Sequence, residues 1–172
     1  MKVVLEQNIT LESKYLNKDV EKHILNKLKN VMKNKSSLEL GYIIDVIRII
    51  KLGDNKISSV NSLAVFNVTF EAETLKPVDG LEVEGQACML SSDGIFVDVL
   101  GKLNIIIPAG DIEDFSYDLI KSVVTCNKKY KKTSIEKGEK LRVKILITKY
   151  EDKKFKCIGQ LKEILKAKKL NK

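Results

Sequence analysis

The chain has 172 residues, of which 44% are hydrophobic, and this composition is ordinary for a folded protein of one or two domains. Its three cysteines form no CxxC pair, which argues against a disulfide scaffold and a zinc site and favours a reducing compartment. No apolar run approaches the roughly 18 residues of a membrane-spanning helix, and the start lacks the apolar core of a signal peptide. We therefore expect an intracellular protein with no membrane partner, metal or cofactor.

The net charge of +8 is concentrated in the last third of the chain. Residues 82–121 hold two lysines and eight acidic residues, whereas residues 126–156 hold twelve basic and four acidic residues. A concentrated basic surface suits a polyanion such as nucleic acid. The alternative is a lysine-rich solvated face from an AT-rich genome, since 29 of the 31 basic residues are lysine.

The first half of the sequence predicts a small sheet with one helix across it. Residues 3–11 alternate as a half-buried strand, and residues 20–32 have helical periodicity. The apolar face of the helix comprises Val20, Ile24, Leu25, Leu28, Val31 and Met32. Residues 41–50 are apolar on both faces, as in a central strand that is covered on both sides. We expect residues 52–61 to form a loop or hairpin end, followed by a long strand at residues 63–75 with strict alternation.

Lys76 and Pro77 mark the boundary between two expected domains, residues 1–78 and residues 79–172. Pro77 lacks an amide hydrogen and cannot lie inside a central strand, so we expect a hinge there. Five strands are expected after it, separated by an acidic, then basic, connection at residues 111–137 with at most one helical turn. The alternating positions begin at Leu81, Ile95, Leu103, Leu141 and Phe155, with Met89 and Ile147 among those that face inward. Three strands, an excursion and two strands are the order of a five-stranded OB barrel.

The clearest functional signal in the second half is Phe96, which alternation places on the outside of its strand with Asp98. A basic strand bearing Arg142 and Lys144 is expected beside it, so Phe96 could stack on a base while the cations attract phosphate. The alternative is that Phe96 is covered, either by residues 111–137 or by a partner.

The run Lys128-Lys129-Tyr130-Lys131-Lys132 is a second candidate for nucleic-acid contact. Four lysines around an aromatic residue could follow a phosphate backbone without reading sequence. A mobile, solubilising loop is the alternative.

Catalytic motifs are missing from the sequence. His23 is the single histidine, and there is no GxSxG, HExxH or GxxxxGK[ST]. The acidic cluster Asp111, Glu113, Asp114 and Asp118 lies in a polar stretch without an apolar pocket to perturb it. We therefore expect no catalytic residues.

Four segments resemble a known family. They are Leu40-Gly41-Tyr42-Ile43-Ile44, Phe66-Asn67-Val68 running to Lys76-Pro77, Gly94-Ile95-Phe96-Val97-Asp98-Val99 to Gly101, and Ile158-Gly159-Gln160-Leu161-Lys162-Glu163. In this order and spacing they resemble the stalk subunit of DNA-directed RNA polymerases. That family comprises the seventh subunit of eukaryotic polymerase II and its archaeal E-type counterpart.

The resemblance implies an α+β protein with a truncated RNP-like sheet and helix, followed by an OB domain. The first domain of such a subunit docks on the polymerase core subunits, and the second meets nascent single-stranded RNA. A small fourth-subunit type protein completes a heterodimer, and the subunit supports transcription initiation without catalysing polymerisation. The docking residues so implied are Gly41, Tyr42, Ile57, Val60, Asn61, Leu63, Lys76 and Pro77. The RNA face so implied contains Phe96, Lys102, Arg142 and Lys144, beside the run at residues 128–132.

A second hypothesis is a free-standing OB-fold RNA-binding protein of translation or RNA decay. The apolar strand at residues 42–50 discriminates between the two, because a stand-alone binder does not need it. The lysine, asparagine and isoleucine bias would fit a large DNA virus, a protist or a cytoplasmic plasmid system. The expected location is accordingly the nucleus for a cellular polymerase, or a virus factory or virion for a viral one.

Overall fold

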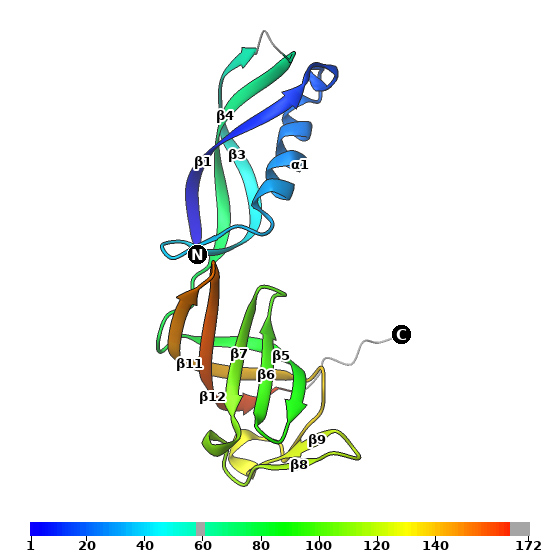
Figure 1. Cartoon of the computed structure of the whole chain (residues 1–172), viewed down its shortest axis with the longest axis vertical. Helices are drawn as coiled ribbons and strands as arrows, with labels where there is room; N and C mark the ends of the chain where they lie inside the picture. The colour runs from blue at the N-terminus through cyan, green and yellow to red at the C-terminus, as the bar shows by residue number, and fades with distance from the viewer. Residues whose placement is uncertain (58–60, 166–172) are drawn as a thin grey trace. The chain divides into compact units, whose positions relative to one another are not determined.

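The computed structural model describes residues 1–57 and 61–165, and the chain divides into two compact units, Met1–Lys76 and Pro77–Lys172 (Figure 1). Each unit has its own sheet and its own core. No helix in the described part of the chain is both long and apolar enough to cross a membrane.

The first unit is a four-stranded antiparallel sheet with one helix packed on it. Its elements are β1 (Lys2–Glu12), η1 (Ser13–Tyr15), α1 (Val20–Met32), β2 (Ser36–Ser37), β3 (Gly41–Ile57) and β4 (Leu63–Leu75). The strand order is β1-β4-β3-β2, so β4 lies between β1 and β3. On α1, Ile24, Leu28 and Met32 are buried, whereas Val31 is exposed, contrary to the prediction.

Strand β4 agrees with the prediction at both ends and on both faces. Every second side chain from Ala64 to Thr74 is buried, and Val68, Phe70 and Ala72 have no exposed surface. These side chains pack with Ile9 and Leu11 of β1 and with the buried face of α1. Strict alternation succeeds here because β4 is a central strand, paired with β1 on one edge and with β3 on the other.

Strand β3 departs from the prediction in length and in burial. It continues to Ile57, so most of the expected loop is strand. Its pairing with β4 shifts register after Ile43, Val46, Ile49 and Leu52. A bulge adds an unpaired residue and turns the strand, so residues three apart face the core: Ile43 and Val46 are buried, but Ile47 and Ile50 are exposed. The prediction that this strand is covered on both sides is therefore wrong for the chain by itself.

The second unit is built on a closed five-stranded barrel. Its strands are β5 (Glu82–Ser91), β6 (Gly94–Val99), β7 (Leu103–Pro108), β11 (Lys140–Glu151) and β12 (Lys154–Ile164), in the order β11-β12-β7-β6-β5. The barrel closes through β11 and β5, and β12 runs parallel to β7 while the other pairs are antiparallel. The interior is aliphatic, with Ile95, Val97, Ile105 and Ile145 fully buried. The predicted fold class, an RNP-like sheet and helix followed by an OB barrel, is confirmed.

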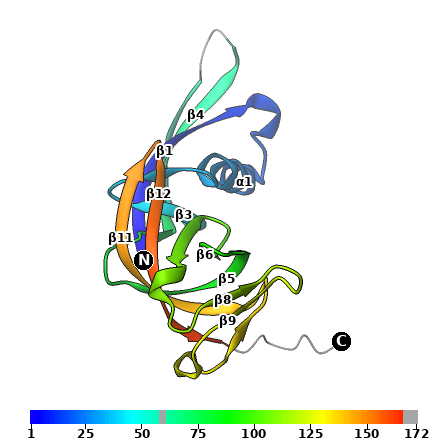
Figure 2. The same cartoon turned by 60° about the horizontal axis from the view of Figure 1, so that its bottom comes forward.

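The connection between β7 and β11 contains more structure than the sequence indicated. Its elements are η2 (Ala109–Asp111), β8 (Ser116–Asp118), β9 (Val123–Thr125), η3 (Lys128–Tyr130) and β10 (Ser134–Ile135). The three short strands form a sheet in the order β10-β9-β8, and β8 and β9 lie at one end of the barrel (Figure 2). Val124, Tyr130 and Ile135 are buried, so this segment is a packed part of the second unit.

Candidate nucleic-acid interface

The lysine run is anchored at its aromatic residue. Tyr130 lies at the end of η3 and is buried, and its hydroxyl accepts a hydrogen bond from the Glu113 backbone N–H at 3.1 Å. The turn begins at Asn127, whose side-chain oxygen accepts the Lys129 backbone N–H at 2.9 Å. The four lysines are exposed around this fixed turn. Tyr130 is therefore a structural anchor, and its ring is not available to stack on a base.

Most of the predicted cationic residues face a carboxylate. Lys129 pairs with Glu113, Lys132 pairs with Glu139, and Lys131 lies 2.6 Å from Glu163. Arg142 bridges two acidic residues, at 3.0 Å from Glu84 and 3.2 Å from Glu163. The hydrogen bond from Lys131, then its charge and last the charge of Arg142, hold the pKa of the Glu163 carboxyl below its usual range.

These ion pairs reduce the local positive potential without blocking phosphate contact. Each lysine remains well exposed, whereas the carboxylates of Glu163 and Glu139 are only 20% and 13% exposed. The ammonium groups of these lysines are therefore open to a phosphate oxygen. Lys128 and Lys144 make no ion pair within the described residues, and Lys102 lies half-buried in the turn between β6 and β7.

Phe96 is half-buried on the outside of β6, but its surroundings differ from the prediction. Strand β5 lies between β6 and the basic strand β11, so Arg142 and Lys144 face Glu84 and Glu82 rather than Phe96. The residues directly opposite Phe96 are Met89 on β5 and Ile106 on β7. The expected arrangement of an aromatic ring beside a basic strand is therefore wrong, because barrel closure pairs β11 with β5 and β12.

The predicted docking residues lie at two ends of the β3–β4 hairpin. Ile57, Asn61 and Leu63 lie where the hairpin turns, and Val60 is outside the described residues. Gly41 and Tyr42 begin β3 at the other end, where Tyr42 is opposite Leu75, and Lys76 and Pro77 follow β4 directly. The twelve steps of β4 span roughly 40 Å at about 3.3 Å each. The two groups therefore cannot form one continuous patch.

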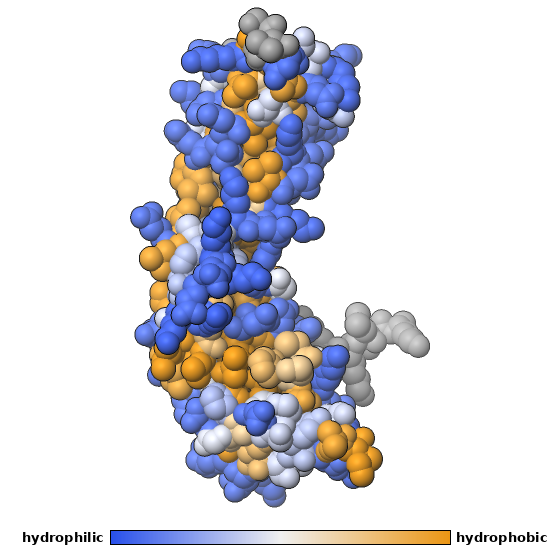
Figure 3. Space-filling model, viewed as in Figure 1, coloured by the Kyte–Doolittle hydropathy of each residue, from blue (hydrophilic) through white to orange (hydrophobic). Residues whose placement is uncertain are grey.

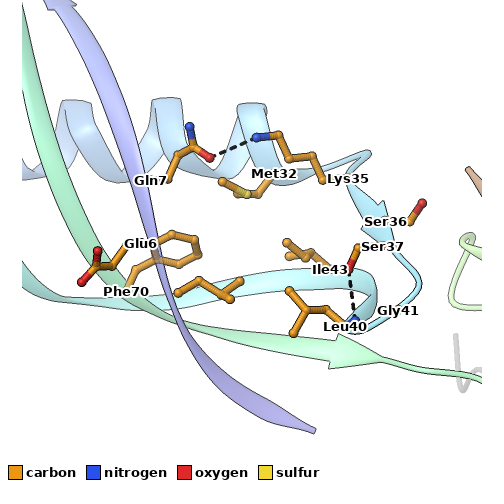
Figure 4. A pocket seen from close by; sticks show the side chains of 11 residues that line it. Glu6, Gln7, Met32, Lys35, Ser36, Ser37, Leu40, Gly41, Ile43 and Phe70 are labelled. Carbon is orange, nitrogen blue, oxygen red and sulfur yellow. Dashed lines mark hydrogen bonds between the residues drawn. The ribbon is translucent and has the colours of Figure 1, made fainter.

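A pocket of about 240 Å³ lies beside Gly41, which the sequence did not indicate. Its apolar lining comprises Leu5, Met32, Leu40, Ile43 and Phe70 (Figure 4). Lys35 donates a hydrogen bond to the Gln7 side chain at 3.1 Å at its rim. Gly41 has φ +77°, and a Cβ there would lie 2.2 Å from the Leu75 carbonyl oxygen, so only glycine fits. The pocket escapes sequence analysis because β1, α1, β3 and β4 each contribute one wall.

Acidic and cysteine side chains are candidates for metal-binding groups and for unusual thiols in the described part of the chain. No group of three or more His, Cys, Asp and Glu side chains there could hold a metal ion. Cys126 and Cys157 are buried, and burial raises the pKa of both thiols. His23 is half-buried against the Tyr15 ring, with ring centroids 4.9 Å apart.

Comparison with known proteins gives two relatives that match both units. The DNA-directed RNA polymerase II subunit RPB7 of Glycine max is 24% identical over 164 residues, which cover 94% of this chain and 91% of that protein. The DNA-directed RNA polymerase II subunit 7 of Arabidopsis thaliana is 21% identical with the same coverage. No protein-family model matches the sequence. The resemblance to the seventh-subunit type of RNA polymerase stalk protein, which the four sequence segments indicated, is thus confirmed along nearly the whole chain.

Proposed function

We propose that this chain is a non-catalytic stalk subunit of a nuclear, polymerase II-type RNA polymerase. The observation that supports it is the extent of the similarity, since the relatives named as polymerase II subunits align with 94% of the chain, through the first unit and the barrel alike. A free-standing RNA-binding protein would need only the barrel. The subunit acts by joining the polymerase core, a small fourth-subunit type partner and the nascent transcript, and so supports initiation.

The turn end of the β3–β4 hairpin is the proposed docking site on the core. Ile57 is 68% exposed there, although it is aliphatic, and Asn61 and Leu63 complete the described part of this end. A single exposed aliphatic residue is common on a protein surface, so Ile57 supports this docking site only together with the similarity to polymerase subunits. Gly41 and Tyr42, with the pocket beside them, shape the opposite end of the unit.

The basic surface around η3 is the proposed contact for nascent RNA. Lys128, Lys129, Lys131 and Lys132 surround the fixed Tyr130 turn, and Lys102, Arg142 and Lys144 extend the basic residues over the barrel. Contact of this kind depends on charge and does not select a sequence.

Affinity purification of the tagged full chain from its own cells tests the proposal. We expect the large polymerase subunits to co-purify in stoichiometric amounts. The variant Ile57→Asp should reduce their recovery at least tenfold, because it buries a charge at the docking end. Val4→Asp is the matched control, since Val4 is also exposed on the first unit but lies within β1.

Two outcomes would contradict the proposal. If the large polymerase subunits are missing from the purified material, the chain is not a polymerase subunit. If the chain is recovered as a monomer that binds RNA tightly, the free-standing RNA-binding function is correct instead.

A further inference from the structure

A row of apolar side chains crosses the outside of the barrel on all five strands. Met89 of β5 is opposite Phe96 of β6, Phe96 is opposite Ile106 of β7, Ile106 is opposite Ile158 of β12, and Ile158 is opposite Ile147 of β11. Directly opposite residues in paired strands lie about 5 Å apart. These five residues, which we call the outer apolar row, are therefore one continuous surface. Figure 3 shows apolar side chains gathered over this part of the barrel.

Solvent reaches the outer apolar row. Met89 and Ile147 are each 49% exposed, Ile106 is 41% exposed, Ile158 is 39% exposed, and Phe96 is half-buried. The core does not need these residues, because the inward positions of the same strands already fill the barrel. Scattered exposed apolar residues are common, but a continuous group of them marks an interaction surface.

Two bulges create the ends of this row. Simple alternation would turn Met89 and Ile147 into the barrel, but the pairing shifts register between Ala87 and Met89 and between Ile145 and Ile147. Each bulge keeps the preceding residue buried and turns the next paired residue outward. Without the bulges, only the central three residues of the row would lie outside.

Three lysines border the β11–β12 side of the row, and one of them, Lys144, is opposite Glu82 of β5. Lys144 and Lys149 lie on β11 on either side of Ile147, and Lys156 lies on β12 opposite Lys149. Lys156 is 2.9 Å from Glu151. On the β6 side, the Asp98 carboxylate accepts the Gly101 backbone N–H at 3.1 Å and is thereby occupied within its own turn. A ligand of the row therefore meets apolar side chains bordered by lysines.

We propose that the outer apolar row binds an amphipathic protein segment whose apolar side is bordered by carboxylates. Charge complementarity with Lys144, Lys149 and Lys156 selects an acidic border over a basic one. Four of the five residues in the row are aliphatic and offer no π face, so the row is poorly suited to stacking bases. This assigns Phe96 to a protein contact, and it leaves RNA to the separate lysine surface around η3.

Methyl NMR of the full chain tests the assignment, because Met89, Ile106, Ile147 and Ile158 each carry an observable methyl group. Two designed 18-residue amphipathic peptides with the same leucine face are titrated, one bordered by glutamate and one by lysine, together with oligouridylate RNA. We expect the glutamate-bordered peptide to shift the four methyl signals and to bind at least tenfold more tightly than the lysine-bordered one. RNA should leave these signals unchanged.

Variants locate the binding. The double variant Ile106→Thr, Ile158→Thr keeps β-branched residues on the strands. It should weaken binding of the glutamate-bordered peptide at least tenfold. Ile120→Thr is the matched control, because Ile120 is a 95% exposed isoleucine in the turn between β8 and β9. Lys149→Glu with Lys156→Glu should reverse the preference between the two peptides.

Three results would overturn the proposal. If RNA shifts the methyl signals of the row, the row is a platform for bases. If neither peptide shifts them, the row is not a docking surface for an amphipathic segment. Equal weakening by the Ile120→Thr control would show that the binding is a general response to exposed isoleucine.

Discussion

Glu163 connects the lysine run to the barrel through two charged contacts. Its carboxylate lies 2.6 Å from Lys131, which belongs to the η3 turn, and 3.2 Å from Arg142 on the neighbouring strand β11. These contacts hold the carboxyl pKa below its usual range. A carboxyl with a lowered folded-state pKa stabilises the fold above its unfolded-state pKa, and this contribution is lost as the pH falls through the folded-state value.

The variant Glu163→Gln should therefore lower the stability of the η3 turn at neutral pH. The difference between the native chain and the variant should shrink in acid and disappear below the lowered pKa of Glu163. The measurement is urea unfolding at a series of pH values, followed through the ring signals of Tyr130, which is buried at this turn.

Glu151→Gln provides the control for that experiment. Lys156 lowers the Glu151 pKa in the same way, but this pair joins adjacent strands across the short β11–β12 turn. Its loss should leave the Tyr130 unfolding curve unchanged at every pH. A pH-independent difference for Glu163→Gln would show that the carboxylate charge does not hold the turn.

Residue partnerships of this kind lay beyond sequence analysis. The sequence identified the lysines and the acidic residues, but Lys131 and Glu163 are separated by 32 positions. Their contact exists because β12 lies beside η3 in the folded second unit. Phe96 shows the same limit: alternation correctly placed it outside its strand, but only barrel closure decides that its neighbours are apolar rather than basic.

At the scale of elements, β3 shows how bulges change the meaning of an apolar sequence. Val46 is buried, whereas the adjacent Ile47 is an unpaired bulge residue and is exposed. Val46→Thr should reduce the stability of the first unit by about 1–3 kcal/mol, because it buries a hydroxyl group without a compensating hydrogen bond. Ile47→Thr should change it by less than about 0.5 kcal/mol, as surface substitutions usually do.

Amide hydrogen exchange in β4 is the measurement for this pair of variants. Exchange from this strand reports opening of the first unit alone, even if the two units unfold separately. Similar losses of stability for both variants would mean that Ile47 is also buried in solution. Strand β3 would then be covered on both sides, as its apolar residues on both faces suggest.

Elements with a regular repeat were the ones that the sequence predicted well. Strand β4 keeps its alternation for thirteen residues, and all five barrel strands were located. Strands β8, β9 and β10 were missed because two or three residues are too few to establish a period of two. The outward positions of Met89 and Ile147 were missed because a bulge leaves no unambiguous mark in the sequence.

At the scale of the whole molecule, the net charge of +8 does not translate directly into a positive surface. The last third of the chain supplies the excess, yet Lys129, Lys131, Lys132 and Arg142 each face a carboxylate. In the proposed contact with RNA, these lysines turn from carboxylates to phosphates. The number of lysines that complete this exchange determines how steeply the affinity depends on salt.

Replacing Lys128, Lys129, Lys131 and Lys132 with alanine should weaken RNA binding and flatten its salt dependence. Each phosphate contact with single-stranded nucleic acid contributes about 0.7 to the slope of log affinity against log salt, so loss of all four contacts reduces the slope by about 2.8. If the three paired lysines stay with Glu113, Glu163 and Glu139, only Lys128 contributes and the reduction is about 0.7. We expect a reduction between about 2 and 3, because the side chains of all three paired lysines are well exposed and can reach a phosphate.

The control replaces four lysines of the first unit, Lys18, Lys22, Lys29 and Lys33, with alanine. It removes the same net charge but leaves the η3 surface intact, so its slope should match that of the native chain. Equilibrium binding of oligouridylate at several salt concentrations gives all three slopes. Equal reductions in the two variants would show that RNA responds only to net charge, and an unchanged slope in the η3 variant would show that these lysines do not touch phosphate.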